Sequence, residues 1–189
     1  MKKELAQEAY ISVDIEASGP IPSKYSMLSI GACLVGDREK EFYQELKPLN
    51  SNFDPEALRV SSLSLNALQT HGATPTDAMN SFRDWVSDVC HGNPPVFVGF
   101  NAVFDWSFIN WYFHEFLGSN PFGHGAIDIK SYYMGLWKTT WADTSSSRLD
   151  ANFQPHQQKT HNALDDAKSQ AEIFERLLKW NSDHTSKKC

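Results

Sequence analysis

The chain has 189 residues and a formal net charge of −6, from 17 basic and 23 acidic side chains. This length favours a single α/β domain, placed at residues 1–180, while the acidic balance excludes a broad basic surface suited to long nucleic-acid duplexes. Three cysteines without a Cys-x-x-Cys pair, no stretch of 18 apolar residues and no apolar leader predict a cytoplasmic protein with no membrane partner.

The first predicted strand carries two acidic residues on one face. Residues 10–16 alternate apolar and polar side chains with the period of a strand, which Gly19 and Pro20 end. Asp14 and Glu16 then lie about 6.5 to 7 Å apart on the same side. Two carboxylates in this arrangement can approach one or two hard divalent cations. A solvated strand face is the alternative explanation of the pair.

Two more strands and two helices are expected next. Residues 27–35 and 41–46 read as strands, so the first three strands form a meander with short connections. Residues 63–70, stopped by Gly72, and residues 76–90, stopped by Gly92, are predicted helices. Thr76 is the expected N-cap of the second of these helices.

A buried strand and a helix with one shielded acid follow. Residues 96–100 are an apolar run, and Asn101 is a suitable place for the chain to turn into a helix rich in aromatic side chains. Asp105 falls in the first turn of that helix, where the aromatic neighbours shield it from water. An acid near a helix N-terminus is also favourable by about 0.3 to 1 kcal/mol without any ligand.

A polar segment separates a predicted helix at residues 129–137 from the last helix. Residues 141–158 are rich in Ser, Asp and Gln. We expect them to form either a mobile flap over a bound molecule or an ordinary surface loop. Residues 181–189 are polar, and we expect a disordered tail there.

The last predicted helix begins near a histidine and two adjacent acids. On a helix, Asp166 shares its stripe with apolar residues and points inward, whereas Asp165 shares its stripe with charged residues and points to water. His161 can face the same site as Asp166 only from the loop that enters the helix, because five residues turn a helix by about 140°. Histidine titrates near neutrality, so His161 is a candidate general base. A surface or capping residue is the alternative.

Taken together, the acidic residues suggest a metal site, and their order and spacing resemble those of the DEDDh exonuclease family. This family includes proofreading exonuclease subunits of DNA polymerases, RNase T and oligoribonuclease. Its first motif, Asp-x-Glu followed by small residues and Gly, is matched at residues 14–19. Its second, Asn-x-x-x-Asp, is matched at residues 101–105, and its third, His-x-x-x-x-Asp, at residues 161–166. The resemblance covers roughly residues 8 to 180.

The resemblance implies a ribonuclease H-like fold with a mixed five-stranded sheet flanked by helices. It further implies two Mg²⁺ or Mn²⁺ ions held by Asp14, Glu16, Asp105 and Asp166, with His161 as general base. The expected reaction is stepwise release of nucleoside 5′-monophosphates from single-stranded 3′ ends of DNA or RNA.

Contacts to the substrate are expected at four positions. Family members often carry Thr-Thr where this chain has Ala17 and Ser18, so contacts to the terminal nucleotide differ there. Asn101 either orients the substrate by hydrogen bonding or caps the helix. Trp141, beside the polar segment, is a candidate for stacking against a base.

The sequence leaves other assignments open. The alternative to an enzyme is a nucleic-acid- or polymerase-binding module of the same fold with weak catalysis. Four mutually repelling carboxylates favour the enzyme, because a binding module has no physical reason to keep them. A homodimer and a polymerase partner are both compatible with the resemblance, and the choice between DNA and RNA is undecided.

Overall fold

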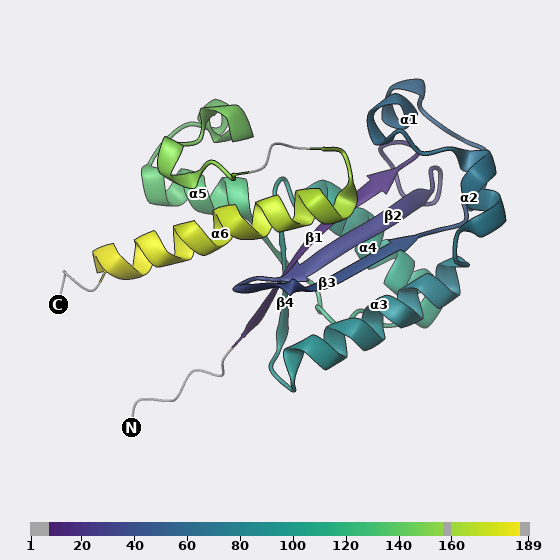
Figure 1. Cartoon of the computed structure of the whole chain (residues 1–189), viewed down its shortest axis with the longest axis horizontal. Coiled ribbons are helices and arrows are strands. Elements are labelled where there is room, and N and C mark those ends of the chain that lie inside the picture. Colours follow the sequence, from purple (N-terminus) through teal and green to yellow (C-terminus); the bar gives the residue numbers. More distant parts are fainter. Residues whose placement is uncertain (1–7, 157–159, 186–189) are drawn as a thin grey trace.

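The computed structural model describes residues 8–156 and 160–185 and forms a mixed five-stranded sheet (Figure 1). The strands are β1 (Ala9–Ala17), β2 (Met27–Leu34), β3 (Asp37–Glu45), β4 (Pro95–Gly99) and β5 (Ala126–Asp128). Their spatial order is β3-β2-β1-β4-β5. The meander β1-β2-β3 is antiparallel, while β4 pairs in parallel with both β1 and β5. The predicted mixed sheet is therefore confirmed.

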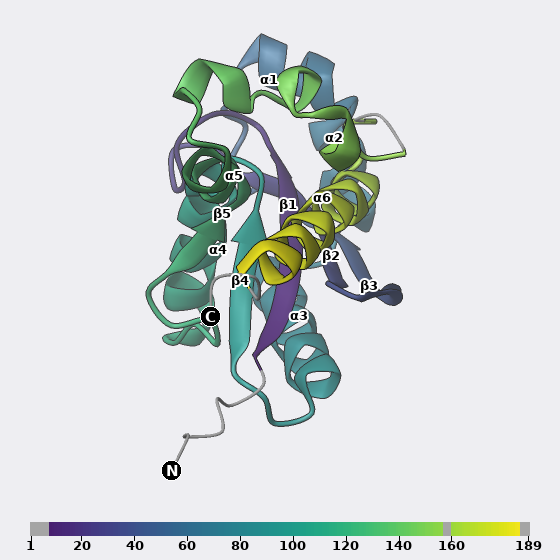
Figure 2. The same cartoon turned by 90° about the vertical axis from the view of Figure 1, so that its left-hand side faces the viewer.

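Helices cover both faces of the sheet. They are α1 (Pro55–Ser61), α2 (Leu65–His71), α3 (Pro75–Cys90), α4 (Val103–Leu117), α5 (Ile129–Trp137) and α6 (Ala163–Thr185). Helix α6 crosses one face, and α3 and α4 lie against the other (Figure 2). Three short 3₁₀ helices follow α5, namely η1 (Trp141–Thr144), η2 (Ser146–Arg148) and η3 (Ala151–Phe153). Among the described residues, no helix is both long and apolar enough to cross a membrane.

Strand β1 explains how an acidic pair can lie inside this fold. Its apolar side chains, Ile11, Val13 and Ile15, are buried in the core that α3 and α4 complete. Its alternate side chains face α6, where the Ser12 hydroxyl donates to the carbonyl of Ala167 at 2.8 Å. Because side chains alternate along a strand, Asp14 lies on the α6 face with Ser12.

Helix α6 approaches the sheet unusually closely at Gly31 of β2. A Cβ atom at this position would lie 2.1 Å from the carbonyl carbon of Ala163 and 2.2 Å from the amide nitrogen of Leu164. Gly31 is paired with Asp14 in the β1–β2 register. The absence of a side chain therefore lets the first turn of α6 lie directly above the acidic part of β1.

Several element boundaries differ from the sequence expectations. Residues 55–61 form α1, capped by Asp54, where no separate helix was expected. Helix α3 begins at Pro75 and is capped by Thr74, so the expected cap at Thr76 is wrong. The Pro at the first helical position explains the shift, because its missing N–H costs nothing there.

The chain also stays helical further than expected. Helix α6 continues to Thr185, so the expected disordered tail is wrong for residues 181–185. Residues 186–189 lie outside the described part of the chain. Strand β3 begins at Asp37 rather than at residue 41, and its alternating exposure is that of a charged edge strand.

Candidate active site

A pocket of about 410 Å³ lies where the carboxyl ends of β1 and β4 meet the first turns of α4 and α6. It is lined by Asp14, Ile15, Glu16, Phe100, Asn101, Phe104, Asp105, Lys130, Ser145, Ser146, His161 and Asp166. The four expected carboxylates and the expected histidine all belong to this set. The structure thus gathers in one pocket five residues that come from three separate parts of the sequence.

Three of the carboxylates lie close enough together to hold a metal ion. One ligand oxygen from each of Asp14, Glu16 and Asp166 lies within 4.8 Å of the others. Asp14 is only 9% exposed and Asp166 only 3%. Clustered anions shielded from water repel one another and are costly unless a cation or hydrogen bonds compensate them. Oxygen donors of this kind suit a hard divalent cation.

Asp105 and Asp166 are oriented by backbone amides. Asp105, in the first turn of α4, is 4% exposed, and its Oδ1 accepts a hydrogen bond from the amide of Ile15 at 3.1 Å. Asp166 Oδ1 accepts from the amide of Thr160 at 3.0 Å. Each bond joins an acid to a second segment of the pocket wall, so the separation of the carboxylates is fixed by the fold.

Gln170 is a supporting residue that the motifs did not reveal. Its Nε2 donates to Asp14 Oδ1 at 2.5 Å, and its Oε1 accepts from the amide of Phe100 at 2.8 Å. This single side chain therefore links α6, β1 and the end of β4. Its position one helical turn after Asp166, on the same inward stripe, was the available sequence signal.

His161 lies outside the last helix, as expected. It is exposed, lines the pocket and has a left-handed backbone with φ 57°. The next residue, Asn162, caps α6, because its side-chain oxygen accepts from the amides of Leu164 at 3.0 Å and Asp165 at 3.3 Å. Capping by Asn162 leaves the imidazole of His161 to face the pocket.

Three of the four expected substrate-contact residues lie in different settings. Asn101 lines the pocket at a left-handed turn, and its side chain does not cap α4. Ala17 lines an adjoining pocket of about 300 Å³ that shares Phe104 with the first. The Ser18 side chain is fully buried, and its hydroxyl donates to the carbonyl of Asn52 at 2.8 Å and accepts from the amide of Ser26 at 2.9 Å. Ser18 therefore joins its own loop to the loop that carries Asn52.

The polar segment after α5 is packed more firmly than either expectation foresaw. Its residues Thr144, Leu149 and Phe153 are buried, and the two apolar ones join a core with α5 and α6. Residues 157 and 158 of the expected flap lie outside the described part of the chain. Ser145 and Ser146 of this segment reach the pocket. No motif could have pointed to them.

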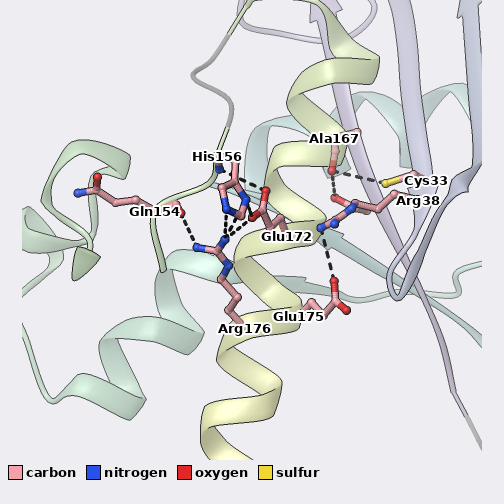
Figure 3. A network of polar contacts seen from close by, with 9 residues as sticks. Cys33, Arg38, Gln154, His156, Ala167, Glu172, Glu175 and Arg176 are labelled. Atoms are coloured by element: carbon pink, nitrogen blue, oxygen red, sulfur yellow. Dashed lines mark hydrogen bonds and ion pairs between the residues drawn. The ribbon is translucent and has the colours of Figure 1, made fainter. Parts of the chain in front are cut away.

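A polar network ties the end of this segment to α6 (Figure 3). The guanidinium of Arg176 donates to the carbonyl oxygens of Gln154 at 2.6 Å and Asn152 at 3.3 Å. Glu172 pairs with Arg176 and with the imidazole of His156. The chain that leads toward His161 is therefore fastened to the helix that carries Asp166. The described contacts of His156 belong to this network, outside the acidic pocket.

Solved structures share the fold of this chain. A 3′-exonuclease described for 3′-end specific recognition of a histone mRNA stem-loop has a TM-score of 0.74 at 16% identity, covering 93% of this chain and 84% of that one. Exonuclease I of E. coli, in complex with a dA16 oligonucleotide, has a TM-score of 0.71 at 14% identity, covering 94% of this chain and 44% of that one. Likeness at such low identity establishes the ribonuclease H-like architecture.

Sequence comparisons identify the family. The 3′-5′ DNA exonuclease Cap18 of Escherichia coli is 50% identical over 173 residues, which span 91% of this chain and 92% of the relative. The family model of the 3′-5′ exoribonuclease Rv2179c-like domain matches residues 9–178. These matches confirm the exonuclease resemblance inferred from the motifs. The chain belongs to the family of Rv2179c-like 3′-5′ exoribonuclease domains.

Proposed function

We propose that this 3′-5′ exonuclease removes nucleotides one at a time from single-stranded 3′ ends, with divalent cations and with DNA as the preferred strand. The observation that carries the proposal is the gathering of Asp14, Glu16, Asp105, Asp166 and His161 in one pocket. The preference for DNA rests on the 50% identity to a relative named as a DNA exonuclease. The family description names an exoribonuclease, so RNA is the competing substrate.

The carboxylates would hold the metal, and Mg²⁺ or Mn²⁺ fits their oxygen donors. Asp14, Glu16 and Asp166 form the close group, and Asp105 completes the set from the first turn of α4. Two such ions, when bound, supply activation of the attacking water and stabilisation of the leaving oxygen.

The protein's own groups perform the remaining tasks. His161 takes the proton from the attacking water at an imidazole nitrogen, because it faces the pocket from a loop outside α6. Asn101, which also lines the pocket, offers an amide to the sugar or base of the terminal nucleotide. Gln170 keeps the Asp14 carboxylate in place through its 2.5 Å hydrogen bond.

The size and charge of the site favour a strand end over a duplex. A pocket of about 410 Å³ is at the small end of the range for ligand pockets, roughly 300 to 1,000 Å³. The net charge of −6 gives no broad attraction to the phosphates of a long duplex. Binding then depends on the few groups inside the pocket.

The test is gel-resolved digestion of 5′-labelled single-stranded DNA and RNA of the same sequence with Mg²⁺ or Mn²⁺. We expect a one-nucleotide ladder that shortens from the 3′ end, faster on DNA, and that is absent in excess chelator. Asp166→Asn should abolish the ladder, whereas Asp165→Asn, the neighbouring acid outside the pocket, should retain it. Faster RNA digestion would reverse the sugar preference.

Other outcomes of the same assay would overturn the proposal more deeply. Undiminished cleavage in excess chelator would show that the reaction does not require a metal ion. A folded protein that binds the oligonucleotide and cleaves neither strand would support the binding-module alternative.

A further inference from the structure

One lysine stands in the wall of the acidic pocket. Among the described residues that line the pocket, Lys130 is the single lysine or arginine. It is the second residue of α5, two positions after the N-cap Asp128. The Asp128 carboxylate accepts from the amides of Ala102 at 3.1 Å and Ser131 at 2.9 Å. These bonds fix the start of α5 against the turn that carries Asn101, and so fix where Lys130 enters the pocket.

The side chain of Lys130 is seated on an aromatic ring. Its Nζ lies 3.9 Å from the ring centroid of Trp141, well inside the range of about 6 Å for a cation–π contact. Trp141 is 50% exposed and belongs to η1, at the start of the segment that carries Ser145 and Ser146. The indole thus restricts a side chain that is otherwise flexible, and one face of its ring is covered by the ammonium group.

The charge of Lys130 is not neutralised by an ion pair within the described structure. The ion pairs between described residues do not include it, although the same pocket holds four carboxylates. A lysine that lines an acidic pocket and pairs with none of its acids remains available to an anion that enters.

The neighbouring wall supplies further donors. Ser145 and Ser146 line the pocket with partly exposed side chains. Hydroxyl and ammonium groups are common partners of phosphate oxygens in protein–nucleic acid contacts. The pocket therefore has an acidic side from β1, α4 and α6, and a side rich in hydrogen-bond donors from α5 and the segment after it.

We propose that Lys130, seated on Trp141 in the pocket that Ser145 and Ser146 also line, binds a non-bridging phosphate oxygen of the nucleic-acid strand. The inference rests on the proposed function and adds a substrate-binding residue to it. It also gives Trp141 a different task from the expected base stacking, namely to position the lysine.

The test compares Lys130→Met with Lys130→Arg in steady-state cleavage of a single-stranded oligonucleotide between 50 and 200 mM salt. Loss of one phosphate contact on a single strand should lower the slope of log(kcat/KM) against log[salt] by about 0.7, or about 2.6-fold over this salt range. We expect K130M to raise KM several-fold at low salt with kcat nearly unchanged. K130R should retain the wild-type slope.

Three further variants separate this role from general charge and from packing. Lys179→Met removes one charge from the exposed side of α6, away from the pocket, and should leave KM and slope unchanged. Trp141→Ala should raise KM in the same direction as K130M, while Trp141→Phe keeps a ring under the ammonium group and should preserve most of the affinity. An unchanged KM and salt slope in K130M would overturn the proposal.

The lysine can be tested even if cleavage is not observed. Fluorescence anisotropy of a labelled oligonucleotide with Ca²⁺ measures binding by wild-type protein and K130M over the same salt range. A wild-type protein that binds without cutting would contradict the proposed reaction, and the difference in salt slope would still decide the role of Lys130. Equal slopes in this assay would reject the phosphate contact.

Discussion

A methyl group at Gly31 should disable the site while leaving the protein folded. The Cβ atom of Gly31→Ala would lie 2.1 Å from the Ala163 carbonyl carbon, whereas ordinary contact begins at 3.4 Å. Helix α6 and strand β2 must therefore separate by about 1.3 Å at this point. Because Gly31 is paired with Asp14 and α6 carries Asp166, the separation changes the distance between two of the clustered carboxylates.

The expected magnitudes for activity and stability differ greatly. A misplacement of about 1 Å in a catalytic arrangement can lower the rate about 100-fold. Overpacking costs roughly 1 to 3 kcal/mol, and for a domain of this size each kcal/mol lowers Tm by about 2 to 4 °C. We therefore expect a loss of about 100-fold in kcat, measured by initial rates of oligonucleotide cleavage, with a fall in Tm of roughly 2 to 12 °C.

A matched glycine provides the control. Gly135 lies exposed in α5 with nothing within 4 Å of its Cβ position. Gly135→Ala should leave the rate unchanged and raise stability by up to about 1 kcal/mol through helix propensity. If G31A folds and cleaves at the wild-type rate, the close approach of α6 does not set the geometry of the site, and the reasoning fails.

Three further predictions follow from the surrounding contacts. Gln170→Leu should lower the affinity for the activating metal ion by about 10- to 100-fold, as for other residues that orient a metal ligand. A metal titration of activity that matches the wild type would contradict this. Burial raises the pKa of Cys33 to about 12, so its contribution to stability is complete below pH 9 and is lost as pH rises toward 12. The free energy of unfolding, measured with urea, should fall less steeply between pH 9 and 12 in Cys33→Ala than in the wild type. Parallel pH dependences in the two proteins would contradict a contribution from the thiol. Arg176→Met should speed amide hydrogen exchange at residues 149–156, because Gln154 loses its 2.6 Å hydrogen bond; unchanged exchange would show that packing alone holds the segment.

The acidic residues could be found from the sequence because each has an informative neighbourhood. Asp14 and Glu16 follow a strict two-residue alternation, and Asp166 lies on an otherwise apolar helical stripe. Such patterns depend only on local periodicity. They identify the residues that point inward without any knowledge of what they meet.

The donor side of the pocket could not be found in this way. Lys130, Ser145 and Ser146 face the acids only because α5 and the segment after it pack beside α6, and no local pattern encodes that crossing. The hydroxyl of Ser18 illustrates the opposite error. The motif position suggested a substrate contact, but the tertiary fold uses the side chain to bind two backbone groups of neighbouring loops.

The sequence contains the signals for two of the helix starts that were predicted wrongly. Asp54 followed by Pro55 is a cap and first-turn signal for α1, and Thr74 followed by Pro75 is the same signal for α3. In contrast, the polar residues 181–185 gave no sign that α6 would continue. Helix propensity alone is a weak predictor of where a helix ends.

The arrangement of β1 has a consequence for biosynthesis. This strand is the first described element to leave the ribosome, but the partners of its acidic end are encoded far downstream. The amide of Ile15 awaits Asp105, 90 residues later, and the carboxylate of Asp14 awaits Gln170, 156 residues later. Contacts of such long sequence separation form slowly. The proposed site is therefore incomplete during most of translation, and its four carboxylates come together only when α6 packs against the sheet.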